Sequence, residues 1–308
     1  MNGIKAIIPA AGFGTRFLPA TKAVPKEMLP ILNKPAIQYI IEEGINSGIK
    51  DFVLVTSRNK KALEDYFDLY PELEKLLQTK KKEDLLKSIS SIIETANFLY
   101  IKQMEQLGLG HAIWAARKAF GNERAAIFLP DDIIMGTTPG MAQLIKVANQ
   151  EKCNVIAVQE VPREEASRYG VISIRRQFSP NLFQIKELVE KPQPGKAPSN
   201  LAIIGRYVLS SKIFEALEDL KFGAGGEVQL TDGIQNLLLS GEKVFAYKIQ
   251  GQRYDAGTTL GWLKTNLDFA LKHPQFSQEM TNYITELEKE ILVLQGKAEA
   301  LKVKQKAL

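Results

Sequence analysis

The residues around the first glycine pair of this chain suit the binding of a polyphosphate. Gly12 and Gly14 follow a short apolar strand predicted over residues 4–9, and Arg16 and Lys26 come after them. Glycines let backbone N–H groups approach an anion closely, and cations neutralise its charge. The order of strand, glycine turn and basic segment therefore predicts a phosphate cradle at the start of an α/β protein.

This turn fits neither of the two common nucleotide-binding motifs. The motif G-x-G-x-x-G fails because Phe17 stands where the third glycine should be. The motif G-x-x-x-x-G-K-[ST] fails because no Gly-Lys-Ser/Thr follows the turn. Pro19 and Pro25 interrupt the basic segment, which therefore cannot be an ordinary helix. We expect an extended loop that lies along a ligand; a simple tight turn is the alternative.

A carboxylate pair further along the chain suits a divalent cation. Asp131 comes shortly after an apolar strand predicted over 125–129, at the edge where open α/β sheets bind ligands. Mg²⁺ usually takes one or two carboxylates together with substrate phosphates. Asp132 is an equal candidate from the sequence alone, and a turn or capping aspartate is the alternative role. His111 and His273 are the only histidines, which argues against a zinc site built from histidines.

Eight segments resemble those of the sugar-nucleotide pyrophosphorylases, a family of nucleotidyltransferases. The longest reads AAGFGTRFLPATKAVPKEMLPILNKPAIQY, and its part over residues 20–30 is similar to the family members that use UTP and glucose 1-phosphate. The other segments are 107–111, 129–131, 169–172, 190–192, 199–210, 226–232 and 254–257. They stand in the family's order between residue 4 and about residue 270.

The resemblance implies an activity, its substrates and a cofactor. A uridylyl group would pass from UTP to α-D-glucose 1-phosphate, giving UDP-glucose and pyrophosphate by direct in-line attack assisted by Mg²⁺. The attacking phosphate is already an anion, so positioning and charge neutralisation supply most of the catalysis. The alternatives are a thymidylyltransferase, a pyrophosphorylase for another sugar, and a regulatory relative that binds the nucleotide without turning it over.

The resemblance also implies a role for individual residues. Nucleotide binding falls to Ala11, Gly12, Gly14, Thr15, Arg16, Lys26, Gln103 and Gly108. Binding of the sugar phosphate falls to Gly170, Glu190, Lys191 and Glu227. The metal ligands would be Asp131 and Asp255, and the catalytic residues would be Arg16, Lys26, Asp131 and Lys191. Arg206 is interpreted as structural.

The elements that must position these residues alternate between strands and helices. Such alternation predicts a largely parallel sheet covered on both faces, and the resemblance implies a three-layer αβα fold of Rossmann-like type with a mixed, mostly parallel sheet. Helices are expected near residues 35–48, 59–69, 72–90 and 109–119. Strands are expected at 6–9, 52–56, 98–101, 125–129, 155–160, 170–175, 183–188, 202–208 and 244–248. The strands between about 155 and 190 suggest an antiparallel addition that carries the second substrate.

The domain organisation follows from these patterns. Residues 1–272 are expected to form the nucleotidyltransferase domain, with a nucleotide part over about 1–150 and a sugar-phosphate part over about 151–272. Residues 273–308 form a helical tail. Apolar residues recur there at heptad spacing: Met280, Ile284, Leu287, Ile291, Leu294, Ala298 and Leu301. The tail either folds against its own domain or pairs with a neighbouring subunit, and the resemblance implies a homodimer or homotetramer.

The bulk properties fit an ordinary globular protein. The chain has 308 residues, of which 45% are hydrophobic and 24% charged, and a formal net charge of +5. No apolar run is long enough to span a membrane, and the start of the chain does not resemble a secretory signal, so we expect a cytoplasmic protein. The single cysteine, Cys153, is interpreted as a core thiol. The basic residues are spread out, and the run Lys80–Lys82 is expected on a solvated helix face, so no nucleic-acid partner is predicted.

Overall fold

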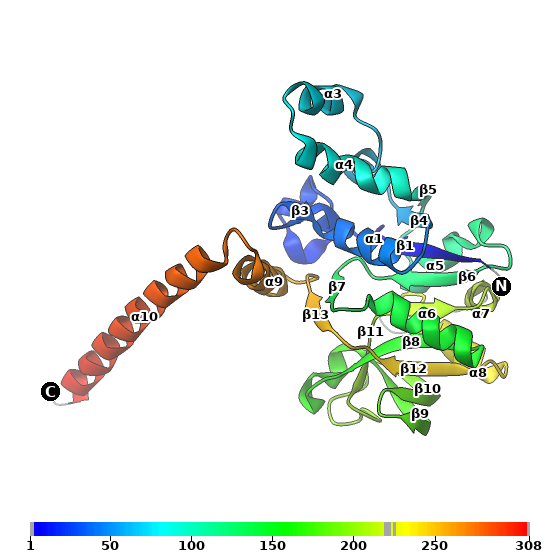
Figure 1. The fold of residues 1–308 in the computed structure, drawn as a ribbon. Coiled ribbons are helices and arrows are strands. Elements are labelled where there is room, and N and C mark those ends of the chain that lie inside the picture. Colours follow the sequence, from blue (N-terminus) through cyan, green and yellow to red (C-terminus); the bar gives the residue numbers. More distant parts are fainter. Residues whose placement is uncertain (1–2, 219–222, 224–225, 307–308) are drawn as a thin grey trace.

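A nine-stranded mixed sheet forms the centre of the molecule (Figure 1). The structure is a computed structural model that describes residues 3–218, 223 and 226–306. The strand order is β5 (Asn97–Lys102), β4 (Asp51–Thr56), β1 (Ile4–Pro9), β6 (Arg124–Phe128), β11 (Leu201–Leu209), β8 (Asn154–Glu160), β12 (Val244–Lys248), β10 (Leu182–Glu190) and β9 (Gly170–Ser179). Only β10 and β11 run against the direction of the other strands of this sheet.

Helices cover both faces of the sheet and close two apolar cores. Neighbouring residues of β1 point to opposite faces: Ile8 packs into the core beneath α1 (Ala36–Asn46) and α6 (Gly140–Glu151). Ile7 packs into the core beneath α5 (Leu109–Ala115), α7 (Lys212–Glu218) and α8 (Leu230–Leu239). Strands buried on both faces need apolar residues at every position, which explains their continuous apolar runs. The predicted three-layer fold with a mixed sheet is confirmed.

Two sequence expectations about helices are wrong in detail. The helix expected over 72–90 is two helices, α3 (Pro71–Thr79) and α4 (Glu83–Thr95). Lys81 has a φ of 55°, and a residue in this left-handed conformation ends a helix. The lysine run therefore lies in the turn between the helices, where all three lysines are exposed, rather than on a helix face. The helix expected over 59–69 is shorter, α2 (Lys61–Tyr66).

The basic segment after the glycine turn is neither a long helix nor an extended loop. It forms three single 3₁₀ turns, η1 (Thr15–Phe17), η2 (Ala20–Lys22) and η3 (Lys26–Met28). The prolines exclude a continuous helix, as predicted, but the chain between them still closes short turns. A small hairpin of β2 (Pro30–Ile31) and β3 (Lys34–Pro35) follows and leads into α1.

A second ladder, absent from the sequence prediction, lies beside the main sheet. β7 (Asp132–Met135) pairs antiparallel with β13 (Gln252–Asp255), and Asp132 lies opposite Asp255. Each strand has only four residues. Three of the four in β13 are polar or charged, and the apolar part of β7 is limited to residues 133–135, which is too short to stand out as a core strand. This ladder joins two parts of the chain that are far apart in sequence.

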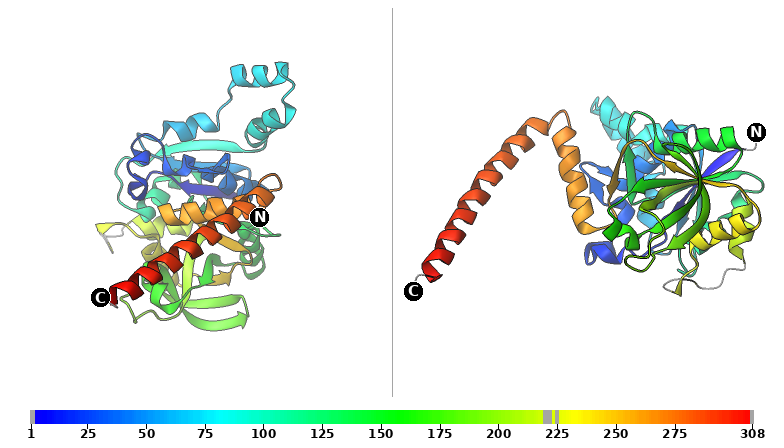
Figure 2. Two further views of the ribbon diagram at one scale, coloured as in Figure 1. Left: turned by 90° about the vertical axis from the view of Figure 1, so that its left-hand side faces the viewer. Right: turned by 90° about the horizontal axis from the view of Figure 1, so that it is seen from below.

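The chain ends in two helices that meet at an elbow (Figures 1 and 2). The first, α9 (Thr259–Lys272), packs on the β2–β3 hairpin: the indole N–H of Trp262 donates to the Pro30 carbonyl at 3.0 Å. The second, α10 (Ser277–Lys306), points away from the sheet in Figure 1 and in the right view of Figure 2. The helical tail is thus present, and its first half does not fold back on the main body. The side chains of Ala298 and Leu301 lie outside the described part.

Two further expectations concern the cysteine and the membrane. Cys153 is buried at the edge of β8, where burial raises the pKa of its thiol to about 12, so it is a core thiol. Among the described residues, no helix combines the length and apolar character that a membrane crossing requires.

Candidate active site

The β7–β13 ladder brings two acidic side chains from distant parts of the sequence to one place. Asp131 immediately precedes β7, and Asp255 ends β13. The backbone N–H of Ala256 donates to the Asp131 carbonyl at 2.8 Å, which ties the end of β13 to the residue before β7. Both carboxylates line the same cavity.

Gly257 lies beside both carboxylates. A Cβ atom at this position would lie 3.0 Å from Oδ2 of Asp131 and 3.1 Å from Oδ1 of Asp255. The Asp255 carboxylate also accepts a hydrogen bond from the Gly257 N–H at 2.9 Å. Two carboxylates that have an oxygen beside the same glycine and line one cavity fit the donor set of Mg²⁺. Among the described residues no group of three or more His, Cys, Asp or Glu side chains could hold a metal, so the candidate site is this pair.

The nearest cation to Asp131 comes from the basic segment. Nζ of Lys26 lies 2.6 Å from Oδ2 of Asp131. Burial alone would raise the pKa of the Asp131 carboxyl, but the charge and hydrogen bond of Lys26 outweigh it and hold that pKa below its ordinary value. In the same way, burial would lower the pKa of Lys26, while Asp131 and Glu27 bring it above its ordinary value.

A buried ion pair fixes the turn that presents Lys26. Nζ of Lys60 lies 2.6 Å from Oε2 of Glu27, and the two side chains are only 6% and 1% exposed. Lys60 follows the end of β4, so the pair attaches η3 to the carboxyl edge of the sheet. Burial outweighs the attraction of Glu27 and lowers the pKa of the Lys60 ammonium. Lys26 therefore reaches Asp131 from a turn, η3, whose position is fixed by the buried pair of Glu27 and Lys60.

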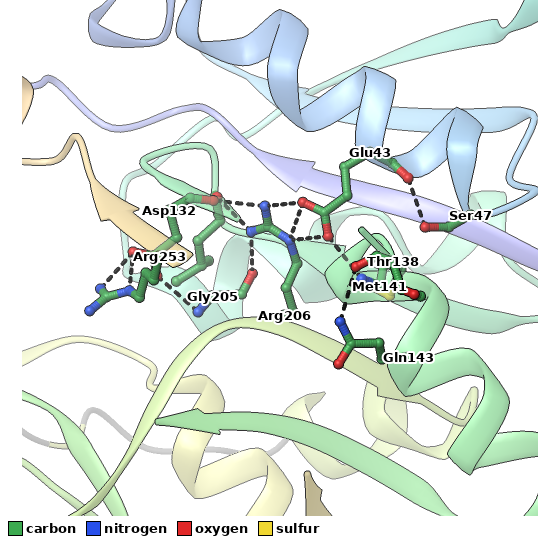
Figure 3. A network of polar contacts seen from close by, with 10 residues as sticks. Glu43, Ser47, Asp132, Thr138, Met141, Gln143, Gly205, Arg206 and Arg253 are labelled. Atoms are coloured by element: carbon green, nitrogen blue, oxygen red, sulfur yellow. Dashed lines mark hydrogen bonds and ion pairs between the residues drawn. The ribbon is translucent and has the colours of Figure 1, made fainter. Parts of the chain in front are cut away.

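Asp132 is fully engaged in structural contacts (Figure 3). Its Oδ1 accepts from Nε of Arg253 at 2.7 Å, and its Oδ2 accepts from the backbone N–H of Gly205 at 2.9 Å. Burial raises the pKa of this carboxyl despite the charge of Arg253. Next to it, Arg206 is completely buried and donates to the Glu43 carboxylate and to the Asp132 carbonyl. Both aspartates line the cavity, but each carboxylate oxygen of Asp132 already accepts a hydrogen bond within the protein. Asp131 is thus the better candidate for a metal ligand.

A cavity of about 380 Å³ lies over the glycine turn. It is lined by every residue of the predicted nucleotide set except Arg16, that is, by Ala11, Gly12, Gly14, Thr15, Lys26, Gln103 and Gly108. Gly14 has a φ of 67°, a left-handed conformation that glycine adopts without strain. The hydroxyl of Thr21 donates to the Gly14 carbonyl at 2.8 Å and holds the turn in this shape.

Side chains at the far wall of this cavity are held by a local network. Nε2 of Gln103 donates to the Gly108 carbonyl at 3.2 Å and lies 3.0 Å from Nδ1 of His111. Gln106, which the sequence did not single out, donates to the Ala11 carbonyl at 2.8 Å. Gly108 has a φ of 102°, and a Cβ there would lie 2.7 Å from the Cβ of Glu227. The segment after Gln103 therefore packs directly on the segment that contains Glu227.

A second cavity of about 510 Å³ adjoins the first, and Leu109 lines both. It contains Arg16, Asp131 and Asp255, and on its other side Gly170 and Glu190. Oε2 of Glu190 accepts from the Thr231 hydroxyl at 2.7 Å, and a Cβ at Gly170 would lie 2.9 Å from this same oxygen. The paired carboxylates thus lie in a cavity next to the one formed by the glycine turn.

Two residues of the predicted sugar-phosphate set lie outside the second cavity. Lys191 does not line it; its Nζ is 3.7 Å from Oε1 of Glu190, and its side chain is 59% exposed. Glu227 lines the nucleotide-side cavity instead. The structure brings together Asp131, Asp255, Gly170 and Glu190, and it leaves Lys191 at the rim.

Several residues that line the second cavity were not predicted from the sequence: Arg168, Tyr169, Tyr207, Gln229, Thr231 and Arg253. Arg253 lies two residues before Asp255 on β13, on the same side of the strand. Its guanidinium lies 5.5 Å from the centre of the Tyr169 ring. Tyr169, Tyr207, Gln229 and Thr231 lie in segments that resemble the family, but no role was assigned to them individually. Arg168 directly precedes one of these segments, and Arg253 precedes Asp255 by the strand period.

Fold and site together define a class: an α/β protein with a glycine-lined cavity and an adjoining cavity that holds two carboxylates, at the carboxyl edge of a sheet. The family model described as nucleotidyl transferase matches residues 5–270, and the chain belongs to this family. A relative from Staphylococcus saprophyticus, named UTP–glucose-1-phosphate uridylyltransferase 1, is 50% identical over 285 residues, covering 92% of this chain and 99% of the relative.

Solved structures show the same similarity. A UTP-bound UGPase from Acinetobacter baumannii has a TM-score of 0.84 and 39% sequence identity, covering 93% of this chain and all of that one. A UDP-glucose pyrophosphorylase complexed with UDP-glucose has a TM-score of 0.81 and 41% identity, covering 89% of this chain and all of that one.

Proposed function

We propose that this protein is an enzyme that transfers the uridylyl group of UTP to α-D-glucose 1-phosphate, forming UDP-glucose and pyrophosphate. The relatives that match nearly the whole chain carry the name of this activity. Similar structures bear UTP or UDP-glucose. The observation in this chain that carries the proposal is that Asp131 and Asp255 face one point, in a cavity beside the one at the glycine turn.

The reaction breaks one phosphorus–oxygen bond and forms another. A phosphate oxygen of glucose 1-phosphate attacks the α-phosphorus of UTP, and pyrophosphate leaves on the opposite side. No residue has to remove a proton, because the attacking phosphate is already ionised. The protein's task is to hold two anionic substrates in line and to neutralise their charge.

We assign the nucleotide to the first cavity. The backbone of Gly12, Gly14 and Thr15 would approach the triphosphate, while Arg16 and Lys26 neutralise it. Gln103, whose side-chain nitrogen is held by Gly108 and His111, would keep its amide oxygen for the base. Ala11 and Gly108 complete the wall beside the base.

We assign glucose 1-phosphate to the second cavity. Glu190 would accept hydrogen bonds from sugar hydroxyls, with Gly170 beside it. Lys191 would reach the phosphate from the rim, where its exposed side chain has room to move. Glu227 lines the first cavity, so it would approach the sugar from the nucleotide side.

Nucleotidyl transferases generally use a divalent cation. We propose Mg²⁺, held by Asp131 and Asp255; when bound, it would neutralise charge on the reacting phosphates. We further infer that residues 1–272 form the catalytic unit, with a nucleotide part over about 1–150 and a sugar-phosphate part over about 151–272. In support, α9 packs on the hairpin that follows the basic segment, and the hydroxyl of Thr259 donates to the Arg16 carbonyl at 3.2 Å.

The test is pyrophosphate release measured across nucleotides and sugar phosphates with Mg²⁺. UTP with glucose 1-phosphate is expected to give the highest kcat/KM. A strong preference for dTTP would indicate a thymidylyltransferase, and a preference for another sugar phosphate would change the second substrate. No release with any pair, although UTP binds, would indicate a regulatory protein.

A further inference from the structure

The side chain of Gln106 joins two walls of the first cavity. Its Nε2 donates to the Ala11 carbonyl at 2.8 Å, and Ala11 directly precedes Gly12 of the glycine turn. Gln106 itself lies in the loop between β5 and α5, which lines another side of the cavity. It stands outside all eight segments that resemble the family, the nearest of which begins at residue 107. The resemblance therefore assigns no role to this side chain.

The loop that carries Gln106 is held on both sides of this residue. The backbone N–H of Gln103 donates to the Thr56 carbonyl at 2.8 Å. The Leu107 carbonyl accepts a hydrogen bond from the Val228 N–H at 2.7 Å. Gln106 lies between these two contacts and is half-buried. The backbone thus holds its side chain in place beside the glycine turn.

The acceptor on the glycine turn fixes which way the Gln106 amide faces. A carbonyl oxygen can only accept a hydrogen bond, so the amide nitrogen must face Ala11 and the amide oxygen, Oε1, must face elsewhere. Within the described part of the chain this oxygen has no hydrogen-bond partner, and Gln106 lines the cavity. The amide therefore keeps an acceptor for a ligand.

The amide of Gln103 is oriented by the same kind of contact. Its Nε2 donates to the Gly108 carbonyl at 3.2 Å, and the residue is only 6% exposed. The two glutamines thus offer the cavity one amide oxygen each, and a ligand that satisfies both must carry two hydrogen-bond donors. In a nucleoside triphosphate only the base and the ribose carry donors, because the ionised phosphates only accept.

The ribose is the part of the nucleotide that lies next to Gln106. The phosphates are assigned above to the turn of Gly12 and Gly14, and the base to Gln103. The ribose connects the two, so it lies between the glycine turn and the loop. The hydrogen bond of Gln106 to Ala11 spans this same interval. Uracil has a single N–H donor, at N3, and with Gln103 assigned to the base, the ribose hydroxyls remain as donors for Gln106.

A neutral acceptor suits this place better than a carboxylate. The triphosphate carries several negative charges, and a carboxylate beside it would repel it. Gln106 accepts without carrying a charge, and its bond to Ala11 orients the amide before the ligand binds, which lowers the entropy cost of binding. Glu227, a carboxylate that lines the same cavity, lies beside Gly108 instead.

We propose that Gln106 accepts a hydrogen bond from a ribose hydroxyl of the nucleotide and thereby selects against nucleotides that lack this hydroxyl. The inference rests on the proposed assignment of the nucleotide to the first cavity. A site that hydrogen-bonds a substrate hydroxyl rejects an analogue without it, because the protein group is then left without a partner. Gln103 selects the base, and Gln106 selects the sugar of the nucleotide.

Isothermal titration calorimetry of the full-length protein with UTP and with 2′,3′-dideoxy-UTP tests this selection. Both titrations contain Mg²⁺ and no glucose 1-phosphate, so turnover is not needed. The wild type is expected to bind UTP more tightly than the dideoxy analogue. In Gln106→Leu the ratio of the two affinities should fall about fivefold, the effect of one hydrogen bond. Titrations with 2′-deoxy-UTP and 3′-deoxy-UTP then identify the hydroxyl.

The affinity ratio separates a contact with the ribose from a purely structural role. Loss of the bond to Ala11 alone would weaken both nucleotides equally and leave the ratio unchanged, and this result would overturn the proposal. Equal affinities in the wild type would overturn it as well. The matched control is Met104→Leu, which should keep the wild-type ratio, since Met104 is 88% exposed on the same loop and lines neither cavity.

The same titrations distinguish this inference from the proposed activity. A protein that shows the expected ratios but releases no pyrophosphate with any sugar phosphate would contradict the proposed uridylyl transfer and support the role of Gln106. A protein that releases pyrophosphate from UTP, with the same affinity ratio in the wild type and in Gln106→Leu, would support the transfer and contradict the role of Gln106.

Discussion

The ammonium of Lys26 lies 2.6 Å from Oδ2 of Asp131, so the basic segment after the glycine turn and the candidate metal carboxylate are joined by one ion pair. The same carboxylate oxygen cannot serve the lysine and a divalent cation equally well. A triphosphate that attracts Lys26 would release Asp131, so the nucleotide and the cation are expected to favour each other's binding.

This competition makes a prediction for the protein without nucleotide. Lys26→Met should bind Mn²⁺ about tenfold more tightly than the wild type, because the competing cation is gone. Electron paramagnetic resonance of free Mn²⁺ measures this affinity without any turnover. Lys22→Met is the matched control, since it removes a lysine of the same segment that is exposed and has no recorded contact with Asp131. Equal Mn²⁺ affinity in the wild type and Lys26→Met would show that the ion pair does not block the site.

The space at Gly257 leads to a second prediction. In Gly257→Ala the added Cβ would lie 3.0 Å from Asp131 and 3.1 Å from Asp255, so the carboxylates must give by a few tenths of an ångström. We expect kcat to fall about tenfold, less than the roughly 100-fold that a displacement of about 1 Å at a reacting centre can cost. The Mg²⁺ concentration for half-maximal rate should rise, while KM for UTP changes little. A variant with normal Mg²⁺ dependence would place the cation elsewhere.

The buried pair of Glu43 and Arg206 is expected to dominate local stability. Arg206 is fully buried, with Nη2 at 2.6 Å from Oε2 of Glu43, and Glu43 also accepts from the backbone N–H of Met141 at 2.8 Å. Glu43→Gln leaves a buried guanidinium without its counter-charge and should lower the free energy of unfolding by about 3–5 kcal/mol in urea titrations.

An exposed ion pair of the same length provides the control for that measurement. Lys212 and Glu242 are also 2.6 Å apart, but the lysine side chain is 62% exposed. Lys212→Ala should cost less than about 1 kcal/mol, because solvent screens exposed pairs. Similar losses in the two variants would contradict the view that burial sets the strength of the Glu43 contact.

Lys191 provides a prediction about the sugar phosphate. Lys191→Ala should raise KM for glucose 1-phosphate about tenfold, the loss of one charge-assisted contact, and leave KM for UTP nearly unchanged. Initial rates at saturating levels of the other substrate measure both constants. A selective loss of UTP binding would move Lys191 to the nucleotide side.

The parts of the fold that the sequence predicts are those whose residues are buried along whole elements. The central strands β1, β6 and β11 follow from their apolar runs, because burial on both faces demands such residues. The edge strands β5 and β9 have many exposed positions, and their patterns are mixed with polar residues. The ladder of Asp132 and Asp255 could not be predicted, since both strands have only four residues, β13 is mostly polar, and their pairing depends on the folded sheet. The same limit applies to the pair of Glu43 and Arg206, which a sequence cannot match across 163 positions.

The candidate site also has one part that the sequence predicts and another part that only the fold reveals. The glycine turn is contiguous in sequence and predicts a phosphate cradle from its own residues, and its members line one cavity. The choice between Asp131 and Asp132 could not be made, because it depends on contacts of Asp132 with Gly205 and Arg253. Arg253 itself was missed because only the fold brings it next to the carboxylates.

Pyrophosphate release by Asp131→Asn, with UTP, glucose 1-phosphate and Mg²⁺, tests the central claim most directly. The wild type should turn over, while the variant should lose at least about 100-fold in kcat, the effect of removing one charged group that stabilises the reacting phosphates. Its thermal unfolding should stay near that of the wild type, because the pair of Asp131 with Lys26 is partly exposed. Turnover of Asp131→Asn at the wild-type rate would contradict the assignment of Asp131 as the metal ligand of a uridylyl transfer site.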